Sequence, residues 1–135
     1  MKPRISIITL GVSHLALSIE FYKKLGFQLE TEKDTDTIAF FFVEGVSARL
    51  VLFPKTELAK DVGVDSTGSG FSGFALAHNV ASENEVDTIL TEAESIGAKI
   101  VKKGQKVFWG GYSGYFADPD GFLWEVAYNP FMDLI

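Results

Sequence analysis

The sequence predicts an α+β domain in which a unit of one strand, one helix and three further strands (β-α-β-β-β) occurs twice in tandem. The chain has 135 residues, which is the size of a single domain. Strand-like and helix-like patterns follow in the same order in both halves, and a Gly/Ser-rich connector at 63–72 separates them. We therefore expect one domain over 1–135, with modules at about 5–54 and 73–130 joined by a linker at 55–72.

The first module begins with a mostly β-branched and apolar segment, 5–12, which favours a strand. Apolar residues then recur at helical spacing and form one stripe: Leu15, Ile19, Tyr22 and Leu25. Ser13 is the expected cap at the start of this helix, and Gly26 its expected end. Further strands are expected at 27–32, 37–43 and 48–53.

The second module repeats this order, starting with a strand at 74–80. Ser82 and Glu85 form a capping box, in which each side chain satisfies a free amide at the start of a helix. The buried stripe of that helix is predicted to be Val86, Ile89, Leu90, Ala93 and Ile96. Three strands are expected after it, at 99–102, 112–117 and 123–128, with an Asp-Pro-Asp-Gly turn at 118–121. The linker includes a short helix at 55–62.

Composition excludes several classes of protein. Hydrophobic residues make up 47% of the chain and charged residues 22%, which indicates a folded core. There are no cysteines, so disulfides and thiol chemistry are excluded. A net charge of −6 argues against nucleic acid and anionic membranes as partners. No segment approaches the ~18 apolar residues of a membrane span. Because 5–10 is better explained as a strand than as a signal peptide, we expect a cytoplasmic protein.

The chain has two histidines, and neither is predicted to take part in chemistry. His14 stands in the first turn of the first helix, where an exposed surface histidine is expected. His78 shares strand parity with Leu76 and Val80, on the face expected to pack against the helices. A half-buried histidine with a hydrogen-bond partner is favoured there over a metal ligand.

Glu125 is the titratable residue that the strand pattern singles out. It lies within an apolar strand and shares a face with Leu123 and Ala127. Burying a carboxylate on such a face is costly unless it has a partner. The pattern leaves two alternatives open: an edge strand with Glu125 in water, or a paired Glu125 inside a site.

Two pairs of segments carry a resemblance that covers nearly the whole chain: Ser18-Ile-Glu-Phe-Tyr22 with Leu25-Gly-Phe27, and Phe108-Trp-Gly-Gly-Tyr112 with Asp118-Pro-Asp-Gly121-Phe-Leu-Trp-Glu125. They resemble the vicinal oxygen chelate superfamily, in its glyoxalase/bleomycin-resistance protein/dioxygenase branch. The resemblance implies that the two modules form an open, barrel-like sheet with a cleft for a small-molecule ligand. It also implies a homodimer.

Active members of that family hold a divalent metal with side chains from the first and last strands of each module. Carried over residue by residue, these positions fall on Ile7, Arg49, Ala75 (to within one residue) and Glu125. A metal ion needs three or four N, O or S ligands, and an arginine repels it. The resemblance therefore implies no metal and no cofactor. In their place we predict a contact between Arg49 and Glu125.

Aromatic residues supply the remaining candidates for ligand binding. The Trp109-Gly-Gly-Tyr112 segment offers flat faces with polar atoms, beside glycines that let a ligand approach the backbone. Phe41 lies on a strand expected to border the cleft. Together with the two charged residues, the predicted ligand-binding set is Arg49, Trp109, Tyr112, Phe41 and Glu125.

Three functions remain open. The first is a metal-free small-molecule-binding protein, similar to the drug-sequestering members of the family. The second is an enzyme with Glu125 as its candidate catalytic residue. This is either a metal-dependent lyase, isomerase or dioxygenase-type enzyme whose unconventional site uses His78 and Glu125, or a metal-free enzyme with Glu125 as general base. The third is a domain without chemistry of its own, either a structural relic or a domain that binds a protein partner.

Overall fold

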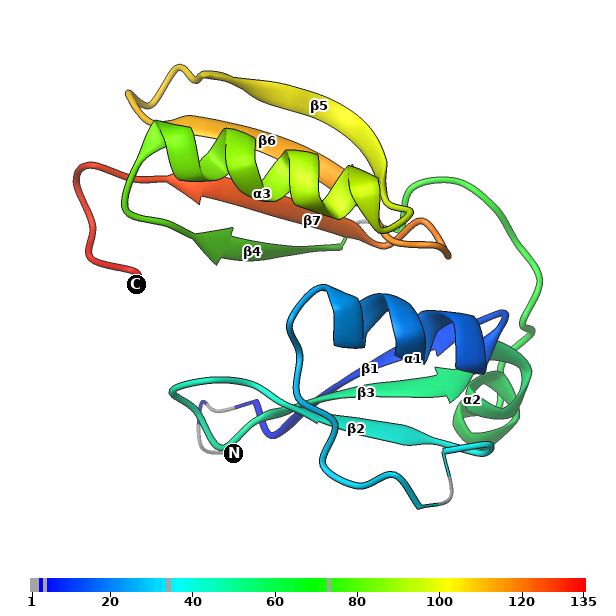
Figure 1. The fold of residues 1–135 in the computed structure, drawn as a ribbon. Coiled ribbons are helices and arrows are strands. Elements are labelled where there is room, and N and C mark those ends of the chain that lie inside the picture. Colours follow the sequence, from blue (N-terminus) through cyan, green and yellow to red (C-terminus); the bar gives the residue numbers. More distant parts are fainter. Residues whose placement is uncertain (1–2, 4, 34, 73) are drawn as a thin grey trace. The chain divides into compact units, whose positions relative to one another are not determined.

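Each half of the chain forms its own sheet with a helix across one face (Figure 1). The computed structural model describes residues 3, 5–33, 35–72 and 74–135. These fall into two units, Met1–Gly70 and Phe71–Ile135, which we call the first and the second module. Gly73, where the sequence places the start of the second module, lies outside the described residues. The cleft expected between the two modules stays a prediction.

The first module contains β1 (Ile7–Val12), α1 (Leu15–Lys24), β2 (Ala39–Phe42), β3 (Arg49–Pro54) and α2 (Lys55–Val62). The strand order is β1-β3-β2, with β3 parallel to β1 and antiparallel to β2. α1 covers one face of this sheet (Figure 1). Rings of Tyr22, Phe27 and Phe41 meet beneath it, with centroids 5.7–6.5 Å apart. This aromatic cluster is the core of the module.

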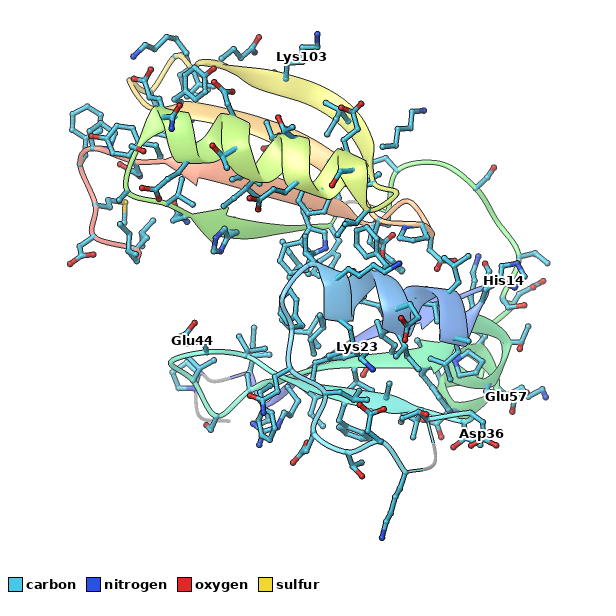
Figure 2. The ribbon with its side chains drawn as sticks, viewed as in Figure 1. His14, Lys23, Asp36, Glu44, Glu57 and Lys103 are labelled. Atoms are coloured by element: carbon cyan, nitrogen blue, oxygen red, sulfur yellow. The ribbon has the colours of Figure 1, made fainter. Side chains whose placement is uncertain are left out.

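The start of α1 differs from the sequence prediction. His14, and not Ser13, occupies the N-cap position, and its side chain makes no capping hydrogen bond. Its backbone carbonyl accepts from the Ser18 amide at 3.0 Å, so the helix begins one residue later than expected. His14 itself is exposed, as predicted (Figure 2).

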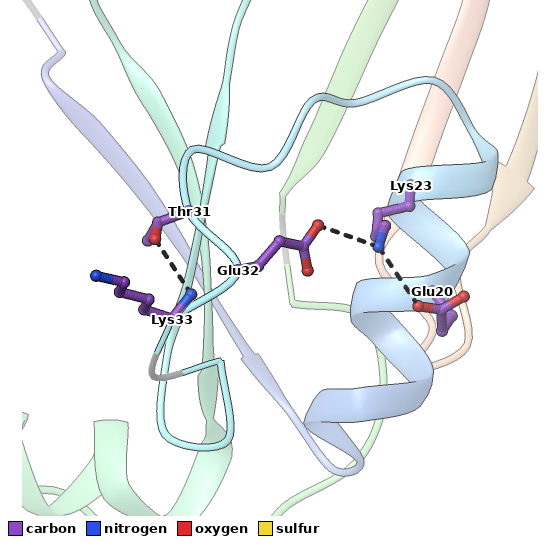
Figure 3. Close-up of polar contacts among 5 residues, drawn as sticks. All are labelled: Glu20, Lys23, Thr31, Glu32 and Lys33. Atoms are coloured by element: carbon purple, nitrogen blue, oxygen red, sulfur yellow. Dashed lines mark hydrogen bonds and ion pairs between the residues drawn. The ribbon is translucent and has the colours of Figure 1, made fainter.

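The strand predicted at 27–32 is reduced to a single bridge between Leu29 and Phe41. The residues that follow, Glu-Thr-Glu-Lys at 30–33, are exposed and polar, so no buried side chain holds them in the sheet. Lys23 instead links this loop to α1: its Nζ lies 3.4 Å from Glu32 Oε1 and 3.9 Å from Glu20 Oε1 (Figure 3).

The first part of the predicted linker belongs to the first module. α2 lies against β1 at Gly11, where an added Cβ would approach both the Leu58 side chain and the Lys55 backbone to 3.2 Å. Glycine therefore makes room for the helix at this position. α2 ends at Gly63, whose φ of 82° is the left-handed conformation of a helix terminus.

The second module contains β4 (Ala75–Asn79), α3 (Glu83–Ser95), β5 (Lys99–Lys106), β6 (Tyr112–Ala117) and β7 (Leu123–Tyr128). The strand order is β4-β7-β6-β5. β4 runs parallel to β7, and the other neighbours are antiparallel. α3 covers one face, above the buried Trp124 and Val126 (Figure 1). The predicted repeat is therefore confirmed as an α+β fold with two related modules.

Two short-range predictions hold in this module. Ser82 Oγ accepts from the Glu85 amide at 3.2 Å, as the capping box predicts, and the Glu85 carboxylate accepts from the Ala81 amide at 3.1 Å, one residue before the N-cap. Asp118 Oδ1 accepts from the amides of Asp120 and Phe122 at 2.9 and 2.8 Å, which fixes the turn between β6 and β7. Within the described residues, no helix is both long and apolar enough to cross a membrane.

Candidate functional site

Each sheet has an open face, on the side opposite α1 or α3, and equivalent side chains form a row across it. In the first module α2 covers the Gly11 end of this face. In the first module the register pairs Ile7 with Arg49, and Arg49 with Phe42. In the second module Glu125 lies between Ala77 on β4 and Tyr115 on β6. Arg49 and Glu125 therefore occupy corresponding places in the last strands of the two modules.

The register changes one predicted position. Ala75, the predicted first-strand position of the second module, pairs with Leu123, whereas Ala77 pairs with Glu125. The position that corresponds to Ile7 is therefore two residues further along β4. The chemistry is unaffected, because both residues are alanines without a metal-binding atom.

The donor set of these rows does not suit a divalent metal. Ile7 and Ala77 offer only hydrocarbon, and Arg49 offers a cation, which leaves Glu125 as the one possible ligand. In the part of the chain that the structure describes, no three His, Cys, Asp or Glu side chains lie close enough to hold an ion. An additional ligand from within this module would have to come from another strand or loop.

His78 does not supply that ligand. It pairs with Val126 in the register, so its side chain points to the face of the sheet opposite that of Glu125. It is also exposed, where the sequence predicted a half-buried histidine. The unconventional site built from His78 and Glu125 is therefore incompatible with the strand register.

Arg49 is held by contacts inside the first module. Its Nε donates to Glu30 Oε2 at 3.1 Å, and its guanidinium carbon lies 4.4 Å from the centre of the Phe42 ring. A second nitrogen donates to the backbone carbonyls of Ser47 and Ala48 at 3.1 and 3.3 Å. An ion pair and a cation–π contact thus fix the position of this side chain.

A cleft of about 310 Å³ opens on the open face of the second module. Its floor comes from β5, β6 and β7, and its rim comes from the turn between β5 and β6. The lining residues are Lys102, Gln105, Lys106, Val107, Phe108, Trp109, Ser113, Tyr115 and Glu125. We call this the second-module cleft. It contains two of the predicted site residues, Trp109 and Glu125.

Glu125 and Tyr115 face each other on the floor of this cleft. They are direct partners in the antiparallel ladder, which brings their side chains together on one face. Burial raises the pKa of the Tyr115 hydroxyl above its ordinary value of 10.0, and the negative charge of Glu125 and a hydrogen bond to its carboxylate raise it further. The half-buried Glu125 therefore has a protonated phenol as its partner, which resolves the alternatives that the sequence left open.

Ser113 adds a buried hydroxyl to the floor. The residue is only 2% exposed, yet it lines the cleft. No hydrogen bond of its hydroxyl is found among the described residues.

The rim of the cleft is a tight turn with two aromatic side chains. The Gly110 amide donates to the Val107 carbonyl at 2.9 Å, and Phe108 is fully exposed. At Gly111 an added Cβ would lie 1.8 Å from the Trp109 ring, and at Gly110 it would lie 3.0 Å from the Phe131 ring. The paired glycines therefore make room for protein rings, and not for a ligand as the sequence suggested.

Three predicted site residues do not line this cleft, and one of them is Arg49 on β3 of the first module. Tyr112 points to the helix-covered face, where its hydroxyl donates to the Asp87 carboxylate of α3 at 3.0 Å. It lines a separate cavity of about 460 Å³. Phe41 is fully buried in the core of the first module, so it has no surface to offer a ligand.

The predicted binding set did not include seven residues that line the cleft: Lys102, Gln105, Lys106, Val107, Phe108, Ser113 and Tyr115. A signal for two of them was present. Once β6 and β7 are joined by the turn at 118–121, counting back from the turn pairs Glu125 with Tyr115, and Ser113 shares the same face. The irregular register of β5 hid Lys102 and Gln105.

The two related modules, each with a corresponding row of side chains on its open face, define the structural class of this protein. Comparison with known proteins identifies the family. The sequence profile of the Glyoxalase/Bleomycin resistance protein/Dioxygenase superfamily matches residues 4–126. The chain belongs to this superfamily, which confirms the resemblance inferred from its motifs. No curated protein matches the sequence significantly.

Solved structures agree with this assignment. A glyoxalase-related enzyme from Fulvimarina pelagi is 34% identical over 95% of this chain and 89% of its own, with a TM-score of 0.82. A glyoxalase/bleomycin resistance protein/dioxygenase from Nocardioides is 27% identical over 95% and 84%, with a TM-score of 0.73. A lactoylglutathione lyase from Agrobacterium tumefaciens is 21% identical over 94% of both chains, with a TM-score of 0.68, and shows similarity of fold alone.

Proposed function

We propose that this protein binds a small organic molecule in the second-module cleft without the help of a metal ion. The observation that carries the proposal is the cleft floor, where Ser113, Tyr115 and Glu125 converge beneath an aromatic rim. Most of the lining residues are polar, with Val107, Phe108 and Trp109 as the apolar part, and precisely placed polar groups of this kind fix the orientation of a small-molecule ligand. The cleft volume, about 310 Å³, lies at the lower end of the range of such sites.

The residues at the family's metal positions support the metal-free part of the proposal. Only Glu125 has a ligand atom, and its hydrogen bond with Tyr115 already engages the carboxylate. In the first module the corresponding residue is Arg49, whose positive charge opposes a cation at that place. We also propose a cytoplasmic location and a homodimer, both of which rest on the sequence and the family resemblance.

Two-dimensional NMR of ¹⁵N-labelled protein, screened against a set of small organic fragments in the presence of EDTA, tests this function. We expect binders to shift the amide signals of β5, β6 and β7 around the cleft. Repeating the titration with Zn²⁺, Mn²⁺ or Ni²⁺ in place of EDTA should leave the affinity unchanged. Fragment binding that appears only after metal is added would contradict the proposal.

A metal-free enzyme is the second candidate, and the pairing of Glu125 with Tyr115 favours it. A carboxylate and a phenol in contact are a suitable general base and general acid for proton transfer. The relative from Fulvimarina pelagi is described as an enzyme, at 34% identity. Glu125→Gln separates the two candidates once a ligand is known: an enzyme converts that ligand and loses this turnover in the variant even at saturating ligand, whereas a binding protein releases the ligand unchanged.

A further inference from the structure

The floor of the second-module cleft carries opposite charges at its two ends. The register aligns Glu125 on β7, Tyr115 on β6 and Lys102 on β5 in one row. Because neighbouring strands lie about 4.8 Å apart, the backbones at Glu125 and Lys102 are about 10 Å apart, with Tyr115 between them. A ligand that lies along this row meets a carboxylate at one end and an ammonium at the other.

Lys102 is the cation left for a ligand in this cleft. Lys106 also lines it, but its ammonium is paired with Glu83 at the start of α3. For the Lys102 side chain, no ion pair or hydrogen bond is found within the described part of the chain. Lys103, the next residue, lines the other cavity, and Figure 2 shows its side chain projecting from β5.

The rim gives the cleft a preference for flat molecules. Phe108 is fully exposed and Trp109 partly exposed, side by side at the tip of the turn between β5 and β6. Exposed aromatic faces gain when a flat ring covers them, since stacking removes apolar surface from water on both partners. Below the rim, the hydroxyl of Ser113 is available to a polar group of the same ligand.

We propose that the ligand is a flat, zwitterionic molecule: an aromatic or conjugated body with a protonated nitrogen at the Glu125 end and a carboxylate or similar anion at the Lys102 end. This inference rests on the proposed function and adds to it the chemical class of the ligand. The carboxylate of Glu125 receives the protonated nitrogen, Lys102 receives the anion, and Phe108 and Trp109 cover the ring.

Four probes separate these contributions: 4-(aminomethyl)benzoate carries both charges, benzylamine only the positive one, benzoate only the negative one, and benzyl alcohol neither. Each is titrated at millimolar concentration into the full-length ¹⁵N-labelled protein. We expect the zwitterion to bind at least about threefold more tightly than either singly charged probe, which is the scale of a partly exposed ion pair. Benzyl alcohol should bind most weakly.

Variants assign each preference to a residue. Glu125→Gln should remove the advantage of the zwitterion over benzoate, and Lys102→Gln its advantage over benzylamine. Phe108→Ala should weaken all four probes. The matched controls are Lys103→Gln, which removes the neighbouring charge outside the cleft, and Phe71→Ala, which removes an exposed ring elsewhere. Both controls should leave every affinity unchanged.

The outcomes also distinguish this inference from the proposed function. If the singly charged probes shift the cleft amides as tightly as the zwitterion, or if the two charge variants change nothing, the zwitterion is overturned while small-molecule binding stands. The same holds if only other fragments of the screen shift these amides. If no molecule of any class shifts them, both proposals fail.

Discussion

Arg49 and Glu30 form an ion pair within the first module, with 3.1 Å between Nε and Oε2. The sequence predicted a different contact for Arg49, with Glu125. The Arg49–Glu125 contact would join the two modules and stays a prediction. Neither side chain requires it, because each has a partner within its own module. Glu30 and the Phe42 ring hold Arg49, and Tyr115 hydrogen-bonds Glu125.

A double-mutant cycle decides which partner matters to Arg49. Both members of the Arg49–Glu30 pair are partly exposed, so we expect Arg49→Met and Glu30→Gln to show a coupling energy of about 0.5–1 kcal/mol in urea unfolding. Arg49→Met combined with Glu125→Gln should be additive. A larger coupling with Glu125 than with Glu30 would restore the contact predicted from the sequence.

Metal removal should not change the stability of the protein. With Ile7, Arg49 and Ala77 at three of the family's four metal positions, a folded chain gains nothing from binding an ion there. We expect substoichiometric Zn, Mn, Fe, Co and Ni in the purified protein, and the same melting temperature with and without chelator. A stoichiometric metal retained through dialysis would overturn this expectation.

Short-range features of this chain could be predicted from its sequence, because neighbouring residues determine them. The capping box at Ser82 and the bounds of β6 and β7 follow from local hydrogen bonding and alternation. Alternation of apolar and polar residues cannot show which face is buried where consecutive residues are all apolar. Three phenylalanines in a row, 40–42, do not reveal which one faces the core, and the structure buries Phe41.

The candidate site was harder to predict, because it depends on the register between strands. The face of Glu125 could be read from one strand, but its neighbours could not. Tyr115 pairs with Glu125 because the turn at 118–121 joins their strands. Lys102 extends the same row from β5, where the register shifts both before and after this residue. A register shift moves side chains relative to their neighbours, so pattern alone does not place residues of β5.

Stability at alkaline pH should report the Tyr115–Glu125 contact. The pKa of Tyr115 is raised in the folded state, chiefly by burial, so the folded protein holds this proton more tightly than the unfolded chain. The resulting stabilisation is fully present below the ordinary pKa of 10.0 and is lost as pH rises through the folded value. Tyr115→Phe should therefore flatten the decline of stability above pH 10.

Absorbance at the phenolate band provides a direct measurement of the same titration. The difference between the wild-type and Tyr115→Phe titrations isolates this hydroxyl, and its midpoint should lie above 10.0. Glu125→Gln removes the negative charge and should lower the midpoint. A difference curve centred at or below the ordinary value would contradict the burial and pairing of Tyr115.

Assembly is predicted from exposed apolar side chains on the open face of the first module. Ile7 is 52% exposed, Ile5 is exposed two residues before it, and Phe42 is exposed on the far side of Arg49 in the same row. We expect a homodimer in light scattering at micromolar concentration, and we expect Ile7→Asp to shift it towards monomer. Val62→Asp, on a valine at the end of α2 that is 64% exposed, is the control and should leave the assembly unchanged. A monomeric wild-type protein would count against the prediction.

The last prediction concerns Tyr112, which the sequence assigned to ligand binding and the structure places against α3. Its hydroxyl donates to the Asp87 carboxylate at 3.0 Å, and this bond ties β6 to the helix that covers it. Removing only the hydroxyl, with Tyr112→Phe, should cost about 0.5–1.5 kcal/mol of unfolding free energy. Because the bond is exposed, the value should lie in the lower part of that range. Asp87→Asn, which keeps an acceptor, should cost less.

Fragment affinities at the second-module cleft should be the same in both variants and the wild type. If Tyr112→Phe left the stability unchanged and weakened fragment binding, Tyr112 would be a ligand-binding residue, as the sequence predicted.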